Sequence, residues 1–484
     1  MTSHHGPHKT AAEIRRELSH PVIDADAHVV ECQFALQDML REVAGPRIAE
    51  RFGEVLDSIS MHRWYRADDA TRRNRRLARP SFWHVPASNT LDRATTMLPS
   101  LMRERLDEFG FDFAVVYTTL GLSFVSLGDQ EMRQALCRSL NRLNAETFRE
   151  HSARLTPAAI IPMGSPAEAI AELEYAVHEL GLKTAFVGGH FWRPLPGAGK
   201  DSGARYMDYL ALDSEYDYDP VWAKCVELKI APASHVGTLG GPTHGSISNY
   251  TFNHAGSFAA GAHIFCRALL LGGVMKRFPQ LKFTFLEGGA GWASMLYNTL
   301  IERFEKRGGE EILRSLDPDR QDRRQMQALF EKYGGRLLAP HAQKMGKDEG
   351  LMLNPPEDRT RVDDFAACGV ATARELADQF ADNFYFGCEG EDRATVMAFD
   401  RRVNHFAKQL KAIFSSDIGH WDVPDMKNVL NETHELVDDE IITRDDFRKF
   451  VFSNVAEMYT SMNPDFFKGT AVESAVAAEF GEAR

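Results

Sequence analysis

The sequence predicts an α/β protein, a (β/α)8 barrel of the TIM type with helical insertions. Eight short apolar segments alternate with segments whose apolar residues have helical spacing, as in barrels of parallel strands and helices. The 484 residues are enough for such a barrel, which needs about 250, and for insertions. Histidine and acidic residues also end several of the predicted strands, at the positions where barrel enzymes assemble their sites.

The first predicted strand, residues 22–31 (VIDADAHVVE), alternates apolar and polar residues. Residues two apart on a strand point the same way, so Asp24, Asp26 and His28 share one face. Asp26 and His28 leave the backbone about 7 Å apart, two strand rises, and can close on one metal ion. The alternative is a buried carboxylate that is hydrogen-bonded to a histidine.

Seven further strands are predicted along the chain, each an apolar run bounded by turn-forming or helical segments. They cover residues 111–118, 155–163, 183–190, 230–235, 281–287, 384–388 and 412–416. Helices are expected at 11–18, 130–151, 166–180, 220–228, 257–278, 292–306, 391–411, 424–438 and 444–459. These strands and helices are sufficient for one barrel, and the sequence contains no internal repeat.

The chain divides into a tail with a short helix (1–20), a single barrel domain (21–465) and a C-terminal tail (466–484). His4, His5 and His8 are expected in a disordered terminus rather than a metal site. Barrel insertions are expected at about 32–110, 191–219 and 307–380. The last is charged and lacks strand-like alternation, so we expect a helical insertion packed on the barrel without a barrel strand.

Composition restricts the class of protein. The net charge of −13 argues against a nucleic-acid binder, and no apolar run is long enough for a membrane span or a signal peptide. Six scattered cysteines without a C-x-x-C pair fit reduced thiols, so a cytoplasmic protein acting on a small molecule is expected. An arginine-dense stretch from Arg63 to Arg79, followed by Trp83, predicts a subunit or substrate boundary in a homodimer or larger homo-oligomer.

Four polar residues end predicted strands: His190, His235, Glu287 and Asp417. In a barrel these positions converge on one mouth. Imidazole and carboxylate ligands suit zinc, iron or manganese. The pattern therefore predicts a site with one or two divalent ions.

The chain resembles the amidohydrolase superfamily, in the branch of aminocarboxymuconate-semialdehyde decarboxylase and resorcylate-type decarboxylases. The resemblance rests on four motifs in order: Asp26-x-His28, ASHVG around His235, RFPQLKFTFLEGGAGW at 277–292 and FSSDIGHWD around Asp417. It implies that Asp26, His28, His235 and Asp417 ligate the metal, and that Asp417 can take a proton from water on it.

Glu287 departs from the family pattern, because decarboxylase relatives have a catalytic histidine there. Glutamate is an anionic oxygen donor, so Glu287 is expected to be a general base or a ligand to a second ion. Asp24 and Glu31 are expected to orient the ligands from behind, although Glu31, like Glu389, could be solvated.

Further residues are expected around the substrate. His190 is a candidate for catalysis and substrate binding, and His254, His420 and Trp421 are candidates for substrate binding.

The resemblance favours metal-dependent hydrolysis or non-oxidative decarboxylation of a small carboxylated substrate. One alternative is a dinuclear non-heme iron monooxygenase, with two irons or iron and manganese, on the same fold. Another is a metal-stabilised binding protein without catalysis.

Overall fold

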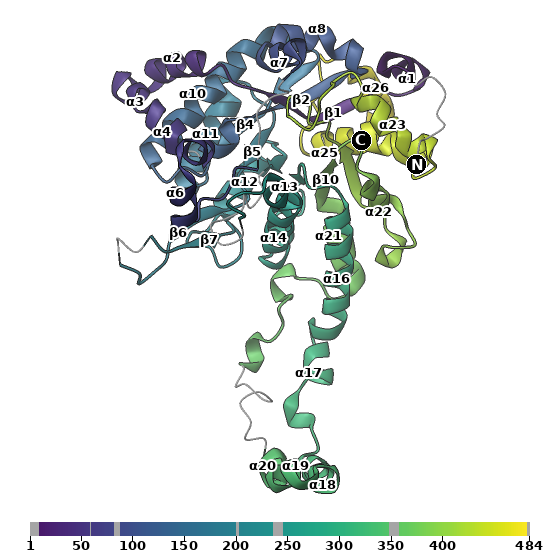
Figure 1. Cartoon of the computed structure of the whole chain (residues 1–484). Helices are drawn as coiled ribbons and strands as arrows, with labels where there is room; N and C mark the ends of the chain where they lie inside the picture. Colours follow the sequence, from purple (N-terminus) through teal and green to yellow (C-terminus); the bar gives the residue numbers. More distant parts are fainter. Residues whose placement is uncertain are drawn as a thin grey trace.

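The computed structural model describes residues 9–58, 60–81, 88–199, 203–235, 245–347 and 358–481. The terminal histidines His4, His5 and His8 and the interface candidate Trp83 lie outside these residues. The described chain forms a barrel-containing body and a long helical arm (Figure 1).

The eight strands predicted from the sequence are all present. They are β1 (Ile23–Val29), β2 (Phe113–Thr118), β3 (Leu155–Pro157) with β4 (Ala159–Ile161), β5 (Ala185–Val187), β8 (Pro232–Ser234), β9 (Phe283–Phe285), β10 (Phe384–Cys388) and β11 (Lys411–Phe414). β3 and β4 are the two halves of the predicted third strand, and Ala158 between them donates its N–H to Val116 O. Most strand residues are fully buried, which explains their near-continuous apolar character.

Every pairing among these strands is parallel, in the orders β1-β2-β3 and β11-β10-β9-β8-β5-β4. The residues that follow β11 bond back to the first strand. Asp417 N–H donates to Asp26 O at 3.0 Å, and His28 N–H donates to Ile418 O at 2.8 Å. These bonds join the last strand position to the first, so the fold is the predicted TIM-type barrel.

Helices surround the strands and cover the body. N-terminal to β2 lie α1 (Ala11–Glu17), α2 (Gln33–Ala44), α3 (Pro46–Glu50), α4 (Phe52–Ser58), α5 (Ser60–Arg66), α6 (Asp69–Asn74), α7 (Thr90–Met97) and α8 (Pro99–Phe109). The following helices are α9 (Gly121–Phe124), α10 (Gln130–Phe148), α11 (Pro166–Glu174), α12 (Asp219–Glu227), α13 (Tyr250–His254), α14 (Ser257–Leu271), α15 (Val274–Arg277) and α16 (Gly291–Arg307). The C-terminal part holds α21 (Ala373–Asn383), α22 (Val396–Phe399), α23 (Val429–Asp438), α24 (Arg444–Arg448), α25 (Asn454–Met462) and α26 (Glu473–Phe480).

Local sequence explains where the crossover helices begin. Asp129 accepts the N–H of Met132 and starts α10. Ser165 and Glu168 form a reciprocal capping box at the start of α11, with Pro166 in the first turn. One face of each helix then packs on the strands, which places the carboxyl ends of the strands at one mouth.

The insertion at 191–219 contains two strands that were not predicted from the sequence. β6 (Phe191–Pro194) and β7 (Arg205–Asp208) pair as an antiparallel hairpin. The buried Arg193 guanidinium forms an ion pair with Asp208 and donates to Tyr218 Oη at 2.9 Å, which ties the hairpin to the body. The pairing depends on contacts distant in sequence, so strand periodicity did not reveal it.

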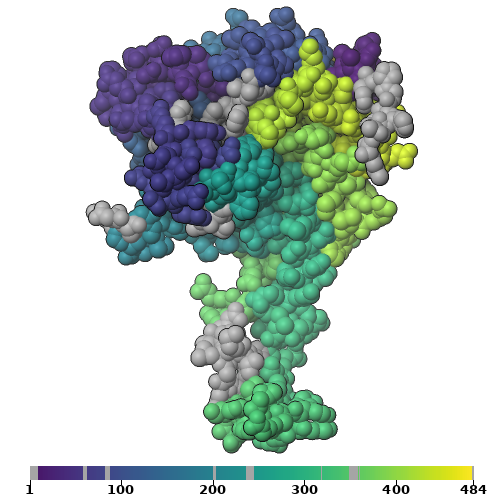
Figure 2. Space-filling model, viewed as in Figure 1, coloured from purple at the N-terminus to yellow at the C-terminus, as the bar shows by residue number. Residues whose placement is uncertain are grey.

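The insertion at 307–380 is helical in its described residues, 307–347 and 358–380, and contains no strand there, as predicted. The prediction that it packs on the barrel is confirmed for residues 365–380, where the buried Phe365 and Cys368 and the helix α21 pack on the barrel. It is wrong for residues 311–347. α17 (Glu311–Ser315), α18 (Arg323–Tyr333), α19 (Gly335–Leu338) and α20 (Ala342–Lys347) extend away from the body as an arm (Figures 1 and 2). α18 packs on α20 at the end of this arm instead of packing on the barrel.

The arginine-dense stretch packs over the loop that precedes α13. Arg72 donates to Trp64 O, and its guanidinium lies 3.9 Å from the Trp64 ring centroid. Arg79 donates from its backbone N to Ser246 O and from Nη1 to Ser248 O. Arg79 therefore holds this stretch to residues 246–248 of the same chain, whereas Arg72 bonds within the stretch. A subunit boundary in this region stays a prediction.

None of the helices in the described part of the chain is long and apolar enough to span a bilayer.

Candidate metal centre

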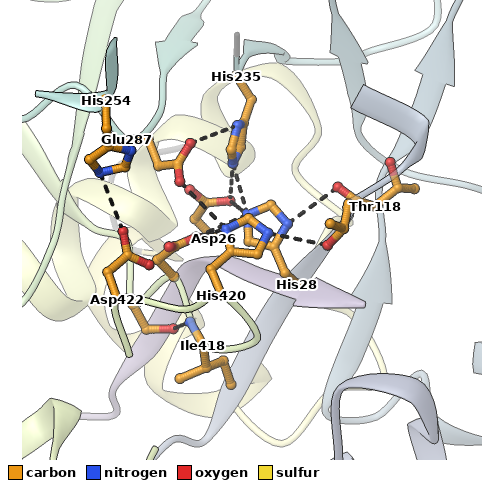
Figure 3. Close-up of polar contacts among 12 residues, drawn as sticks. Asp26, His28, Thr118, His235, His254, Glu287, Ile418, His420 and Asp422 are labelled. Atoms are coloured by element: carbon orange, nitrogen blue, oxygen red, sulfur yellow. Dashed lines mark hydrogen bonds and ion pairs between the residues drawn. The ribbon is translucent and has the colours of Figure 1, made fainter. Parts of the chain in front are cut away.

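The side chains expected to bind metal converge on one buried centre at the barrel mouth (Figure 3). β1 supplies Asp26 and His28, and His235 follows β8. Glu287 follows β9, and Asp417 and His420 follow β11. Each is at least nine-tenths buried, and Asp26, His28, His235, Asp417 and His420 are fully buried.

Four ligand atoms face one point. His28 Nε2 lies 2.8 Å from His235 Nε2 and 3.3 Å from Asp417 Oδ1. Asp26 Oδ1 lies 3.4 Å from His28 Nε2 and 3.2 Å from His235 Nε2. Ligands about 2.0–2.2 Å from a common ion stand about 3 Å or slightly more from each other. The four side chains therefore have the spacing of one ligand set.

The oxygens of this set also fit a cation. Neither carboxylate oxygen of Asp26 or Asp417 has a well-aligned hydrogen-bond donor within the described chain, although all four are buried. Buried carboxylate oxygens are almost always paired. A divalent ion would supply the missing positive partner.

A second group adjoins the first and shares Asp417. His420 Nδ1 lies 2.6 Å from Asp417 Oδ1 and 3.5 Å from Glu287 Oε1. The His420 ring stacks on His28, with 3.7 Å between ring centroids. Each of the three-residue sets Asp26–His28–His235, His28–Asp417–His420 and His235–Glu287–Asp417 brings its ligand atoms within 4.8 Å of one another. Each of these three sets could hold a divalent ion.

The other ring nitrogen of His28 and of His235 faces an oxygen atom. His28 Nδ1 lies 3.3 Å from Thr118 O, and a proton there leaves Nε2 free to ligate. His235 Nδ1 lies 3.4 Å from Glu287 Oε2. Glu287 can thus act on the centre by holding His235, in addition to the two roles expected from the sequence.

Asp24 and Glu31 support the ligand-bearing backbone. Asp24 accepts from Ser416 N–H at 2.9 Å and Ser416 Oγ–H at 2.5 Å, next to Asp417. Glu31 is buried rather than solvated and accepts N–H bonds from Thr119, Leu120 and Gly121. Thr119 Oγ1 in turn lies 3.2 Å from His420 Nε2.

Two residues of the centre have a strained backbone conformation. Glu287 and Asp417 have φ angles of +57° and +52°, which non-glycine residues rarely adopt. Gly419 has φ +113°, and a Cβ there would lie 2.8 Å from His28 O. The turn after β11 therefore approaches β1 so closely that only glycine fits, and it aims Asp417 and His420 into the centre. Such strain is common at functional sites.

Charge crowding dominates the electrostatics. Burial, followed by the negative charges of Glu287, Asp422, Glu389 and Asp26, raises the pKa of Asp417 well above its usual value. Burial, which the charge of His420 reinforces, lowers the pKa of His28 to about 4. These shifts describe carboxylates and histidines that lack a compensating cation.

His235 and Asp26 behave as an ion pair. Burial opposes the protonated form of His235, but Asp26 and Glu287 outweigh it and raise the pKa of His235 to about 9. Burial opposes the charged form of Asp26, but His235 and His28 hold its pKa below the usual value. Burial also raises the pKa values of Asp24 and Glu31 to about 7, against the hydrogen bonds each accepts.

Two of the substrate-binding candidates, His254 and Trp421, form an aromatic wall beside the centre, whereas a third, His420, lies within the centre itself. The His254 ring lies 5.3 Å from Trp421 and stacks on Tyr250 at 5.6 Å. His254 Nε2 lies 3.7 Å from Asp422 Oδ2, as Figure 3 shows. Phe258 connects this wall to the centre, at 6.1 Å from His254 and 6.3 Å from His235.

His190 stands apart from these groups. Its ring lies 5.9 Å from Trp192, and burial lowers its pKa to about 4, so it is a neutral histidine at pH 7. Among the described residues it belongs to none of the ligand sets. A direct catalytic role of His190 stays a prediction.

Sequence reasoning missed several residues of the site. Thr118 is the last residue of β2 and Thr119 follows it, and their position at a strand end was the available signal. Asp422 belongs to the FSSDIGHWD motif itself. Tyr250 gave no signal, because only the tertiary fold brings it against Trp421.

Fold and centre together define a barrel protein of the amidohydrolase type. The amidohydrolase family model matches residues 23–309. The chain belongs to this family, a class of metal-dependent enzymes.

Two solved structures show the same fold at low sequence identity. An amidohydrolase from Mycobacterium avium subsp. paratuberculosis is 17% identical, with a TM-score of 0.53, over 91% of this chain and 100% of that one. A manganese-bound 5-carboxyvanillate decarboxylase from Novosphingobium aromaticivorans is 13% identical, with a TM-score of 0.50, over 92% and 98%. At these identities the likeness concerns the fold.

Proposed function

We propose that this protein is a metal-dependent hydrolase of a small organic substrate. Non-oxidative decarboxylation is the alternative reaction at the same metal centre. The observation that carries the proposal is the convergence of Asp26, His28, His235 and Asp417 on one point. The atom pairs cited for this set are 2.8–3.4 Å apart, and the carboxylate oxygens have no well-aligned hydrogen-bond donor among the described residues.

The four side chains would hold one divalent ion of zinc, iron or manganese, which when bound polarises a substrate oxygen and acidifies water. Asp417 and His420, 2.6 Å apart, would accept and pass on a proton at Asp417 Oδ1. Glu287 would orient His235 through Nδ1 or act as a second base. His254 and Trp421 would bind the substrate on the aromatic side of the mouth.

The acid–base groups of the centre favour hydrolysis over decarboxylation. Hydrolysis needs a base, and Asp417 and Glu287 are carboxylates held in the centre. Decarboxylation needs a proton delivered to carbon, and in this chain a glutamate replaces the histidine that the family resemblance associates with that step. The residues named at this mouth are acidic residues, histidines and aromatic residues, with no lysine or arginine among them. A carboxylate on the substrate would therefore need the bound metal as its positive partner.

A dinuclear iron monooxygenase is the second candidate. It is favoured by the adjoining group of Asp417, His420 and Glu287, which could hold a second ion next to the first. This candidate predicts two redox-active ions per chain, whereas the hydrolase requires only one ion of any of the three metals.

The deciding experiment is metal analysis of protein purified without chelators, combined with turnover assays in air and under argon. Aryl esters, lactones and hydroxybenzoic acids serve as test substrates. One ion per chain with oxygen-independent turnover supports the hydrolase. Two irons, or iron with manganese, with oxygen- and reductant-dependent turnover supports the monooxygenase.

A matched pair of variants tests the ligand assignment. His235→Ala should lose most bound metal, while His178→Ala, which changes an exposed histidine, should keep it. Full stoichiometric metal in His235→Ala, or a metal-free wild-type protein, would contradict the proposal.

A further inference from the structure

The end of the helical arm carries an exposed apolar and basic surface. We call residues 320–347 the tip; it contains α18, α19 and α20. Leu329, Tyr333, Leu337 and Leu338 are 45%, 70%, 69% and 56% exposed. These four large apolar side chains are exposed within ten consecutive residues, and a patch of exposed apolar residues typically marks an interaction site.

The tip also differs in charge from the rest of the molecule. It contains seven lysine and arginine residues and two acidic residues, a net charge of +5. The whole chain carries −13, so everything outside the tip carries −18. A basic apolar tip on an acidic molecule is complementary to the body of another copy.

The body offers a matching surface at the β6–β7 hairpin. A hollow of about 730 Å³, which we call the hairpin hollow, has an apolar wall of Pro194, Leu195, Pro196 and Tyr206. Exposed Asp213 and Glu215 form its acidic edge. Leu195 is 46% exposed, so the wall is open to a docking side chain.

The two surfaces of one molecule do not meet. In Figure 1 the tip lies at the end of the arm, well separated from β6 and β7 on the body. Figure 2 shows the tip as a separate globule joined to the body by a narrow stalk. The tip can therefore fill a hairpin hollow only on a second molecule.

We propose that two copies of this chain form a dimer in which the tip of each docks in the hairpin hollow of the other. Leucines and Tyr333 of the tip cover the apolar wall, and tip cations such as Arg336 and Lys344 face Asp213 and Glu215. Because the exchange is mutual, a two-fold axis closes the assembly at two copies. The contact lies outside the metal centre, so metal content and turnover provide independent readouts.

Sedimentation equilibrium of the full-length protein tests the dimer. The wild type should sediment at twice the 54.4 kDa of one chain. Leu337→Asp and Tyr333→Asp should each raise the dimer dissociation constant by about 100-fold. Leu98→Asp is the matched control, because Leu98 is 53% exposed but lies on the body between α7 and α8. It should leave the dimer intact.

Charge reversal tests the hollow. Arg336→Glu with Lys344→Glu on the tip, and Asp213→Lys with Glu215→Gln on the hollow, should each give monomers. An equimolar mixture of the two should restore a dimer, because each contact then pairs opposite charges. Circular dichroism and metal content identify any variant that fails to fold.

Three outcomes would overturn the proposal. These are a monomeric wild type, a dimer that survives the tip variants, and charge-reversed variants that do not complement each other. Binding of a monomeric wild type to phosphatidylglycerol vesicles through the tip would assign the tip to a lipid surface instead.

Discussion

Glu287 and Asp417 show how the centre depends on single residues. Both follow barrel strands, both have positive φ and both place a carboxylate against a histidine nitrogen. The barrel must hold this strained backbone, because the conformation costs about 1–3 kcal/mol at each residue. The gain is that two anionic groups face the same point from the ends of β9 and β11, which are separated by β10.

Glu287→Gln separates the roles of this side chain. The substitution keeps size and removes the negative charge. If Glu287 acts as a base or as the partner of His235, the variant should keep the first ion, and its turnover should fall by about 10²–10⁴-fold. As a ligand of a second ion, its loss should lower the metal content from two ions towards one.

The control for this substitution is Glu391→Gln, which changes an exposed carboxylate of the same charge and should alter neither readout. Wild-type turnover and wild-type metal content in Glu287→Gln would show that Glu287 has no part in the centre.

The turn after β11 is the element that brings β1 and the last strand together. Asp417 and His420 lie on it, and its backbone bonds to β1 at Asp26 and His28. Gly419 permits the approach, since a Cβ there would also lie 3.0 Å from His28 Cβ. Ligand geometry is therefore set by how closely this turn packs on β1.

Gly419→Ala should displace His28 and weaken both folding and metal binding. Gly469→Ala is its matched control, because Gly469 also has a positive φ (+79°) but its added Cβ meets nothing within 4 Å. We expect the control to lose about 1 kcal/mol of unfolding free energy and Gly419→Ala about 1–3 kcal/mol more. Urea denaturation measures both, and equal losses would contradict the close packing.

For the whole molecule, the crowded carboxylates couple metal binding to stability. An ion that binds only the folded state adds about 2.7 kcal/mol when its free concentration is 100 times its dissociation constant. Zinc or manganese added to chelator-treated protein should therefore raise the melting temperature by several degrees. His235→Ala should show little of this rise in scanning calorimetry, while His178→Ala should show all of it.

His20 couples global stability to pH from outside the centre. Its ring is buried and stacks on Phe452, and burial lowers its pKa. The unfolded chain therefore binds a proton more readily than the folded protein, so stability is lost as the pH falls through about 6.5. Above that range His20 is neutral in both states and contributes no pH dependence.

His20→Gln should reduce the difference in unfolding free energy between neutral and mildly acidic solution. His178→Gln, which replaces an exposed histidine, should leave the difference unchanged. Urea titrations at two pH values measure it. An unaltered difference in His20→Gln would show that this histidine does not contribute.

The sequence by itself determined the barrel and the principal members of its centre. The spacing of apolar residues located the eight strands and the helices between them. Few folds bury the apolar faces of such alternating elements, and the barrel is one of them. In a parallel barrel the strand ends meet at one mouth, which is why His235, Glu287 and Asp417 could be grouped before their distances were known.

Only the tertiary structure decided the features that depend on contacts between distant segments. The 2.6 Å approach of His420 to Asp417 requires the turn at Gly419, and the link from Glu31 through Thr119 requires β1 beside β2. The arm projects because α18 packs on α20 and not on the barrel. An amphipathic pattern predicts that the apolar face of a helix is buried, but the surface that buries it is decided by the tertiary fold.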